Sequence, residues 1–398
     1  MNGNVKNINI DLFNNLPPHL IDAIFENLPL NIIWLFSLSS NDPIYSISLT
    51  HLFKKIVILP DYPFEFNFNL SPSNYNKILI LNYSKSLLFS KNLLNYTQFL
   101  SIQSEGGNDF NILNHLITTT TSNNIKRFKK FKQIKSFAIS LIYYHQDYFS
   151  INNFNSLILN FLSSFNNSSL LKLNINSTLF NNNSIQFFVN NIIHLNFENL
   201  SLLNLNFNFL NSIPFFPHSP FTQNLKYLNL SNNRINTIQN LNNLPNLIYL
   251  DLSNNNIKKI QNLNNLHNLK ILKINLIPNK NWLQIDDGII LIENLNNLTN
   301  LRILQLVGND ILEIQNLDNL KNLIELNLSN NQISKIQNLS NLSNLNILNL
   351  KNNCISKLEN LSKLSNLIEL NLSNNKISNP DNLPYLKNLN FLNLDNNT

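Results

Sequence analysis

Leucine and isoleucine recur in one fixed order along the second half of the chain. From Asn224 onward, the phrase LxxLxLxxNxIxxIxxLxxLxN repeats every 22 residues. Copies begin at Asn224, Asn246, Asn268, Asn300, Asn322, Asn344, Asn366 and Asn388, and a looser copy occupies residues 199–223. One copy alone cannot bury its apolar side chains, so the pattern predicts that neighbouring copies stack into an elongated solenoid.

Seven aliphatic positions in each copy are expected to face one shared core. We count the first asparagine of a copy as position 0, so the seven are positions 1, 4, 6, 11, 14, 17 and 20. In the copy from Asn322 they are Leu323, Leu326, Leu328, Ile333, Ile336, Leu339 and Leu342. Burial of each such side chain contributes roughly 1.5–3 kcal/mol, so together they favour stacking.

Asparagine takes the place of glycine as the turn-forming residue. The chain has only 5 glycines, and asparagine tolerates left-handed backbone angles and bonds its own backbone. Position 9, where each strand turns away, forms a stacked column of Asn233, Asn255, Asn309, Asn331, Asn353, Asn375 and Asn397. Their amides can satisfy backbone groups that otherwise cost about 1–3 kcal/mol each when buried and unpaired. We therefore interpret this column as structural.

The repeated phrase resembles the leucine-rich repeat. Its length, with isoleucine at positions 11 and 14, is similar to the class found in phosphatase-1 regulatory subunits, and the resemblance covers residues 199–398. It implies an α/β solenoid, a leucine-rich-repeat horseshoe with parallel strands on the concave face and irregular or 3₁₀ segments on the convex face. It also implies that a protein partner binds on the concave face. A stand-alone scaffold or a phosphatase-1 regulator is the alternative to a role in a ubiquitin ligase.

Residues 61–198 are less regular. Five short apolar runs indicate strands at residues 77–81, 98–102, 135–141, 170–175 and 192–197. Their uneven spacing leaves two interpretations open. Degenerate leucine-rich repeats with helices on the outer face would give this pattern, and so would an unrelated α+β domain.

Residues 1–60 predict a small helical module. An amphipathic helix follows a proline start, with Leu20, Ile24 and Leu28 on one face. The phrase LPxxLxxxIFxxLP resembles the first helix of the F-box, a three-helix family that docks to the Skp adaptor of a cullin ubiquitin ligase. The resemblance implies contact with the adaptor through Leu16, Pro17, Leu20, Ile24 and Leu28. The tryptophan common near the third F-box helix is absent, so a helical cap over the first repeat is the alternative.

Strand side chains at positions 3 and 5 point away from the core and form the concave face. Position 3 carries apolar groups that the fold does not require, and Tyr227 and Tyr249 would lie side by side as interface anchors. Basic residues come early and acidic residues late, which would steer a partner of opposite gradient. The predicted partner-binding residues are Tyr227, Tyr249, Lys273, Arg302, Ile303, Glu325, Ile347, Glu369 and Phe391. Cross-strand packing on a pleated surface is the alternative.

The copy from Asn268 carries an insertion, because it is 32 residues long instead of 22. The extra residues fall within about 276–286, where the strand leaves the concave face. The loop is expected to overhang that face, with Trp282 as an anchor beside Asp286. In the alternative interpretation, Trp282 folds back onto the edge of the solenoid.

Catalysis finds no support in the sequence. The 7 histidines are scattered, Cys354 has no second thiol with which to bind zinc, and 5 glycines form no phosphate loop. We predict that the protein is not an enzyme. No catalytic residue, metal ligand, cofactor or small-molecule substrate is expected.

Composition and charge limit which partners and which cellular compartment are expected. The formal charge is 28 − 22 = +6, but only 13% of residues are charged, which is too dilute to indicate nucleic acid. A basic run at residues 126–135 offers an RNA-binding alternative, although such runs are more typical of a solvated helix face. The single cysteine and the lack of a signal peptide or bilayer-length apolar run predict a cytoplasmic protein, with the nucleus as the alternative.

Overall fold

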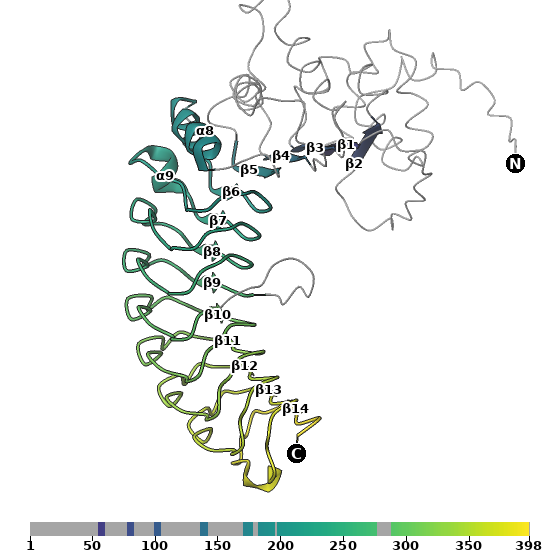
Figure 1. Ribbon diagram of the computed structural model, residues 1–398, viewed down its shortest axis with the longest axis vertical. Coiled ribbons are helices and arrows are strands. Elements are labelled where there is room, and N and C mark those ends of the chain that lie inside the picture. Colours follow the sequence, from purple (N-terminus) through teal and green to yellow (C-terminus); the bar gives the residue numbers. More distant parts are fainter. Residues whose placement is uncertain are drawn as a thin grey trace, which may run out of the picture.

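The structure, a computed structural model, describes residues 55–59, 78–82, 99–104, 136–141, 170–177, 182–195, 197–276 and 288–397. Over these residues, 14 strands form one parallel sheet in the order β14-β13-β12-β11-β10-β9-β8-β7-β6-β5-β4-β3-β1-β2. Only the first two strands leave the sequential order, because β1 lies between β3 and β2. The array curves, with the strands on its inner side and the return segments on its outer side (Figure 1).

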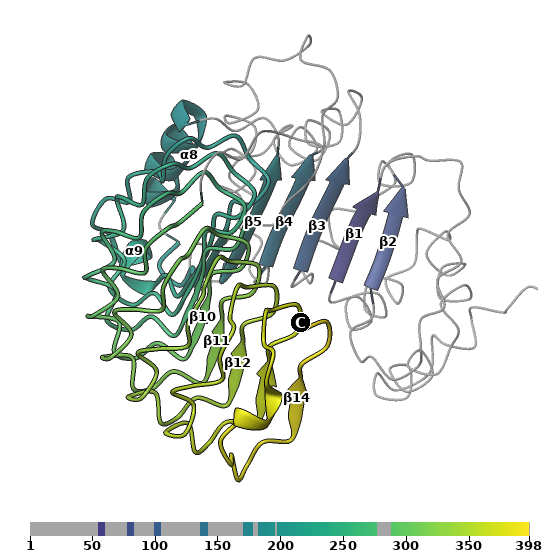
Figure 2. The ribbon, with the colours of Figure 1, turned by 60° about the horizontal axis from the view of Figure 1, so that its bottom comes forward.

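Two kinds of strand make up the sheet. The longer ones are β1 (Lys55–Leu59), β2 (Ile78–Asn82), β3 (Phe99–Ser104), β4 (Ser136–Leu141) and β5 (Lys172–Ser177). The repeats supply three-residue strands: β6 (Leu202–Asn204), β7 (Tyr227–Asn229), β8 (Tyr249–Asp251), β9 (Ile271–Lys273), β10 (Ile303–Gln305), β11 (Glu325–Asn327), β12 (Ile347–Asn349), β13 (Glu369–Asn371) and β14 (Phe391–Asn393). Figure 2 shows the longer strands side by side, all running in one direction.

Each repeat strand occupies positions 3–5 of its copy, in register with its neighbours. Tyr227 pairs with Tyr249, and Tyr249 with Ile271, so equal positions lie opposite one another across the sheet. The middle residue of every strand from β7 to β13 is a fully buried leucine. Positions 3 and 5 therefore turn to the opposite face. This arrangement confirms the predicted leucine-rich-repeat solenoid with parallel strands.

The aliphatic positions form one continuous core beside the asparagine column. In the copy from Asn322, all seven predicted side chains are 0% exposed. Asn331 Nδ2 donates to the carbonyl oxygens of Leu306 in the preceding copy (3.0 Å) and Leu328 in its own copy (2.9 Å). Its Oδ1 accepts from the Ile311 amide at 3.1 Å. Equivalent bonds recur at Asn233, Asn255, Asn353 and Asn375. The column is structural, as predicted, and joins each copy to the one before it.

Asparagine also forms the left-handed turns. Asparagines at position 8, and at position 16 in the copies before the one from Asn366, have φ between 54° and 61°. At position 16 the amide bonds the preceding copy, for example from Asn338 to the Ile314 carbonyl at 2.8 Å. At position 0 the amide bonds the residue just before the preceding copy, for example from Asn344 to the Lys321 carbonyl at 2.9 Å. The asparagine-rich composition is therefore a requirement of this fold.

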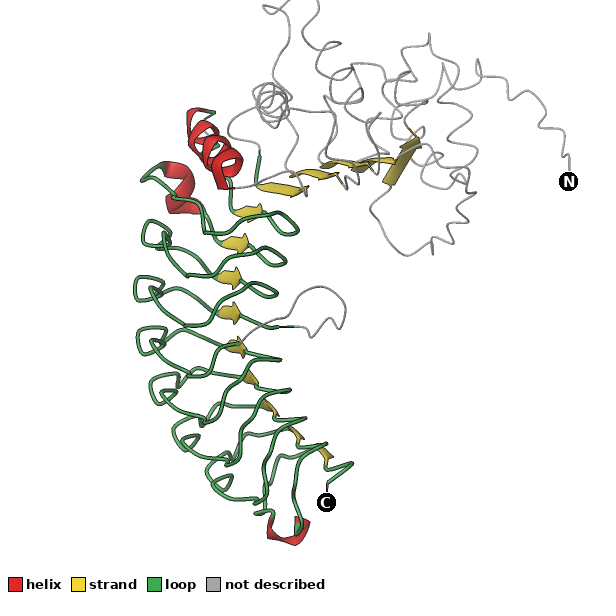
Figure 3. Ribbon diagram, in the orientation of Figure 1, coloured by secondary structure: helices red, strands yellow, loops and turns green. Residues whose placement is uncertain are grey.

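The less regular half agrees with four of the five predicted strands. β2, β3, β4 and β5 overlap the runs at 77–81, 98–102, 135–141 and 170–175. The fifth prediction is wrong, because residues 192–194 end the helix α8 (Asn182–His194). This helix lies on the outer side of the sheet (Figure 3) and buries Ile185, Phe188 and Val189. Apolar residues spaced by three and four are the signature of a helix, which the short apolar run concealed.

Two further helices lie among the described residues. The helix α9 (Pro220–Asn224) begins with a capping box between Ser219 and Thr222. The 3₁₀ helix η3 (Pro380–Asn382) lies in the copy from Asn366. Strand β1 corrects the helical assignment of residues 1–60, because residues 55–59 are extended and any helical module must end before them. The residues compared with the F-box, Leu16, Pro17, Leu20, Ile24 and Leu28, lie outside the described residues.

Candidate protein-binding face

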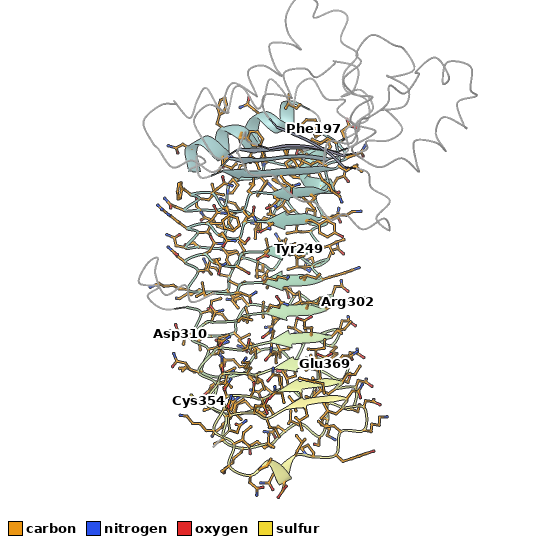
Figure 4. The ribbon with its side chains drawn as sticks, turned by 90° about the vertical axis from the view of Figure 1, so that its right-hand side faces the viewer. Phe197, Tyr249, Arg302, Asp310, Cys354 and Glu369 are labelled. Carbon is orange, nitrogen blue, oxygen red and sulfur yellow. The ribbon has the colours of Figure 1, made fainter. Side chains whose placement is uncertain are left out.

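The outward positions of β7–β14, together with position 2 just before each strand, form the surface that we call the concave face. Figure 4 looks onto this surface, with Tyr249, Arg302 and Glu369 along the strands and with Asp310 and Cys354 at the edge where the strands end. All nine residues predicted to bind a partner have half-buried or exposed side chains, and eight of them lie within strands. The ninth, Arg302, directly precedes β10. The structure thus places these side chains outside the core, and their role in binding a partner stays a prediction.

A tyrosine pair lies at the start of the concave face. The ring centroids of Tyr227 and Tyr249 are 6.2 Å apart, with 37° between the ring planes. Tyr227 is 41% exposed, whereas its inward neighbour Leu228 is fully buried. Tyrosine combines a large contact area with few rotatable bonds, and it is enriched at binding hot spots. The pair has the character of a preformed contact point.

Tyr249 is fixed in place by its neighbours on both sides. Its hydroxyl donates to Asp251 Oδ2 at 3.0 Å, while Asp251 Oδ1 accepts from the Ser253 amide at 2.9 Å. The Lys273 ammonium group lies 5.7 Å from the centre of the Tyr249 ring, within range of a cation–π contact. Burial, and then the charge and hydrogen bond of Asp251, raise the pKa of Tyr249 above its ordinary value. The hydroxyl therefore stays protonated well above neutral pH.

Charge is divided along the concave face. The side chains of Lys226, Lys270 and Arg302 are exposed near β7–β10. Acidic groups dominate further on, where Glu325 accepts a hydrogen bond from Gln305 Nε2 at 2.7 Å and Glu369 is exposed. Aliphatic side chains separate these charges in the position 3 row. The face can thus make both polar and apolar contacts on a rigid sheet.

Two exposed phenylalanines of the looser copy were missed by the sequence reasoning. Phe207 is 57% exposed and Phe209 is 38% exposed. The Arg234 guanidinium carbon lies 4.4 Å from the centre of the Phe209 ring. Phe207 has φ of 54° at position 8, where most other copies have asparagine. The absence of asparagine at position 8 of this copy was the signal in the sequence.

The predicted site in the insertion and the single cysteine lie away from the strands. Trp282 and Asp286 of the insertion lie outside the described residues. Cys354 is a free, half-buried thiol at position 10, a column that holds a different residue in most copies. Among the residues that the structure describes, no group of histidine, cysteine or carboxylate side chains could hold a metal ion. Within the same ranges, no helix has the length and apolar character needed to cross a bilayer.

These features define a repeat solenoid that presents a rigid, strand-lined surface. A family model described as leucine-rich repeats, two copies, matches residues 223–265 and 321–363. A leucine-rich-repeat protein from Leptospira interrogans shares the fold with a TM-score of 0.54 and 22% identity, over 91% of this chain and 76% of that one. Internalin C2 from Listeria monocytogenes is 31% identical over 52% of this chain and 83% of its own, with a TM-score of 0.40. No curated protein sequence matches the chain.

The protein is a leucine-rich-repeat protein with repeats of about 22 residues. Repeats of this family are typically non-catalytic and generally serve in protein–protein recognition. The solenoid explains this use, because it holds many side chains in fixed positions on one extended surface.

Proposed function

We propose that this protein binds another protein on its concave face. The observation that supports the proposal is the tyrosine pair of Tyr227 and Tyr249, which the core does not need. Tyr249 is oriented by Asp251 before any partner arrives, and a preorganised aromatic side chain loses little conformational freedom on binding. Tyr227 leaves 41% of its surface exposed for contact. The neighbouring aliphatic side chains extend the apolar contact along the row.

Site-specific photo-crosslinking tests this proposal. A photoreactive amino acid would replace Ile303 on the concave face, and in a matched variant it would replace Lys335, an exposed residue on the return path. We expect a defined protein to be crosslinked from position 303 in cell extract, and not from position 335. Adding Tyr227→Ala should reduce the yield at position 303. Identical products from both positions would refute binding on the concave face.

We further propose a more specific role, in which the protein is the substrate receptor of a cullin ubiquitin ligase. It is supported by the segment from Leu16 to Pro29, whose phrase LPxxLxxxIFxxLP resembles the F-box. The test is copurification of Skp adaptor and cullin with the full chain and with a Leu20→Asp, Ile24→Asp variant. Adaptor bound to the full chain and absent from the variant is the expected result. Absence from both samples, or presence in both, would remove the ligase proposal.

The alternative is a scaffold or a phosphatase-1 regulator without a ligase role. It is supported by the repeat length and the isoleucines at positions 11 and 14, which are similar to the repeats of that regulatory class. The same copurification separates the two proposals. Phosphatase-1 recovered without the adaptor supports the regulator, and recovery of neither supports a scaffold.

A further inference from the structure

We propose that the part of the concave face formed by β7–β10 takes a short acidic segment of a protein partner, with apolar side chains between its carboxylates. This inference rests on the proposed function, because it names the chemistry of the partner on the same face. It arises from three features of this part of the face. Its cations form no ion pair with any carboxylate that the structure describes, its acidic residue is already engaged within the protein, and an apolar row lies between the charges.

Three of the four cations of this segment are exposed, and the fourth lies beside the Tyr249 ring. Lys226, Lys270 and Arg302 are exposed at position 2 of three copies, and Lys273 is half-buried at position 5. Within the described part of the chain, none of these four cations forms an ion pair with a carboxylate. Like charges held on one rigid surface repel one another, and an anionic partner would relieve that repulsion.

The one acidic residue of this segment does not neutralise them. Both carboxylate oxygens of Asp251 are engaged, one by the Tyr249 hydroxyl at 3.0 Å and the other by the Ser253 amide at 2.9 Å. Asp251 therefore positions the tyrosine and closes the turn after β8. The formal charge of the segment is 4 − 1 = +3, from four cations and Asp251.

The row at position 3 makes a peptide a better occupant than a nucleic acid. Tyr227, Tyr249, Ile271 and Ile303 lie opposite one another in register across β7–β10. Four adjacent strands span about 14 Å, which is roughly four residues of extended peptide. Aliphatic side chains in this row suit the apolar side chains of a protein, whereas nucleic acid offers phosphate and flat bases.

The following strands strengthen this choice. On β11–β14 the charged side chains at positions 2, 3 and 5 are Glu325 and Glu369, so that segment has a formal charge of −2. A uniformly anionic polymer would be attracted by β7–β10 and repelled by the strands beyond. A protein can reverse its charge along its length and satisfy both segments.

Charge reversal with a charge-matched control tests the inference. The concave variant carries Lys226→Glu, Lys270→Glu and Arg302→Glu. The control carries Lys335→Glu, Lys357→Glu and Lys363→Glu, three exposed lysines outside the strands. Both variants of the full chain have the same net charge, so any difference between them reports position. The gentler variant Lys226→Gln, Lys270→Gln, Arg302→Gln provides the test if charge reversal impairs folding, which far-ultraviolet circular dichroism would reveal.

The probes are a fluorescein-labelled peptide of alternating glutamate and leucine, its lysine–leucine counterpart, and a single-stranded RNA of mixed sequence. Fluorescence anisotropy should show binding of the glutamate peptide, weakened at least about tenfold by the concave reversal and less than about twofold by the control. Equal losses in both variants, or equal binding of the lysine peptide, would overturn the inference. Tighter binding of RNA than of the glutamate peptide would make nucleic acid the occupant and would overturn it as well.

The crosslinking experiment keeps this inference separate from the proposed function. If position 303 captures a protein through a segment that is not acidic, and the concave reversal leaves that capture intact, only the acidic-segment inference fails. If position 303 captures nothing that position 335 does not, the proposed function itself fails. Capture through an acidic segment, lost in the concave reversal and kept in the control, supports both.

Discussion

The carbonyl oxygen of Leu276 occupies the space that a Cβ atom would need at Gly308. Leu276 is the last described residue before the insertion, and its amide donates to the Val307 carbonyl at 2.7 Å. Gly308 has φ of 72° at position 8. Six other copies have asparagine at this position, with nearly the same backbone angle. The glycine is therefore required by the close approach of Leu276, and not by the turn alone.

Gly308→Asn should destabilise the protein although it restores the residue found in most copies. Asparagine accepts the left-handed angle, but its Cβ would overlap the Leu276 carbonyl. We expect a loss of about 1–3 kcal/mol in the free energy of unfolding, which is typical of forced overpacking. Chemical denaturation of the full chain, followed by circular dichroism, measures this loss.

The matched control is Asn330→Gly, which introduces glycine at the same position of the next copy. It removes a hydrogen bond from Asn352 but no backbone constraint, so the expected loss is no more than about 1 kcal/mol. Equal stability of Gly308→Asn and wild type would show that the Leu276 contact is relieved without cost.

The contrast at position 8 illustrates what the sequence could predict. The 22-residue period located the strands from β7 to β14 and most of the aliphatic core positions, because each copy repeats one local solution. The exceptions lie at the C-terminal end, where Leu389 and Leu394 are half-buried and Leu392 is 39% exposed. The reason for Gly308 could not be predicted, because it depends on Leu276, which is brought close only by the stacking of copies. The helix α8 was missed for a related reason, since its apolar face is short and lies outside the periodic half.

Asn331→Ala should be far more damaging than the loss of one ordinary hydrogen bond. The side chain bonds Leu306, Leu328 and the Ile311 amide, all in buried surroundings. Alanine would leave these groups unpaired, and each unpaired buried group costs about 1–3 kcal/mol. We expect the free energy of unfolding to fall by more than about 3 kcal/mol in urea titrations.

Asn344→Ala serves as the comparison for that prediction. Asn344 is exposed and makes a single bond, to the Lys321 carbonyl at 2.9 Å. Its loss should cost only about 0.5–1.5 kcal/mol. Similar losses in both variants would mean that a buried asparagine of position 9 stabilises the fold no more than an exposed asparagine of position 0.

Inward-facing and outward-facing positions of the repeat should lose different amounts of stability on substitution by alanine. Leu328→Ala removes a fully buried core side chain and should cost about 2–5 kcal/mol. Tyr227→Ala truncates a side chain that is 41% exposed, so stability should change by less than about 1 kcal/mol. Only Tyr227→Ala should lower the yield of partner crosslinked at position 303. A stability loss as large as that of Leu328→Ala would make the tyrosine pair a packing element.

For the candidate site, the positions of the residues could be predicted from the sequence, but their contacts could not. Strand alternation placed eight of the nine predicted residues at outward positions, because position fixes direction in a strand, whereas Arg302 directly precedes β10. Their role in binding a partner stays a prediction. Sequence alone did not reveal that Asp251 is engaged by Tyr249 and Ser253. That detail makes Asp251, an acidic residue among the early basic ones, a residue that positions Tyr249.

Tyr249 should make the stability of the protein sensitive to alkaline pH. Its pKa is raised in the folded state, first by burial and then by Asp251, so the unfolded chain loses this proton first. The stabilising contribution is complete below the ordinary tyrosine pKa of about 10 and declines as pH rises above it. Denaturation of wild type and Tyr249→Phe at increasing pH should show a shallower alkaline decline in the variant.

Asp251→Asn separates the two causes of the raised pKa. Removing the carboxylate charge should lower the pKa of Tyr249, yet burial should keep it above the ordinary value. The measurement is an NMR titration of isotope-labelled tyrosine rings, with the Tyr249 signal assigned from its absence in Tyr249→Phe. A pKa unchanged by Asp251→Asn would mean that burial alone sets it. A return to the ordinary value would mean that the carboxylate of Asp251 dominates, contrary to the order of causes inferred from the structure.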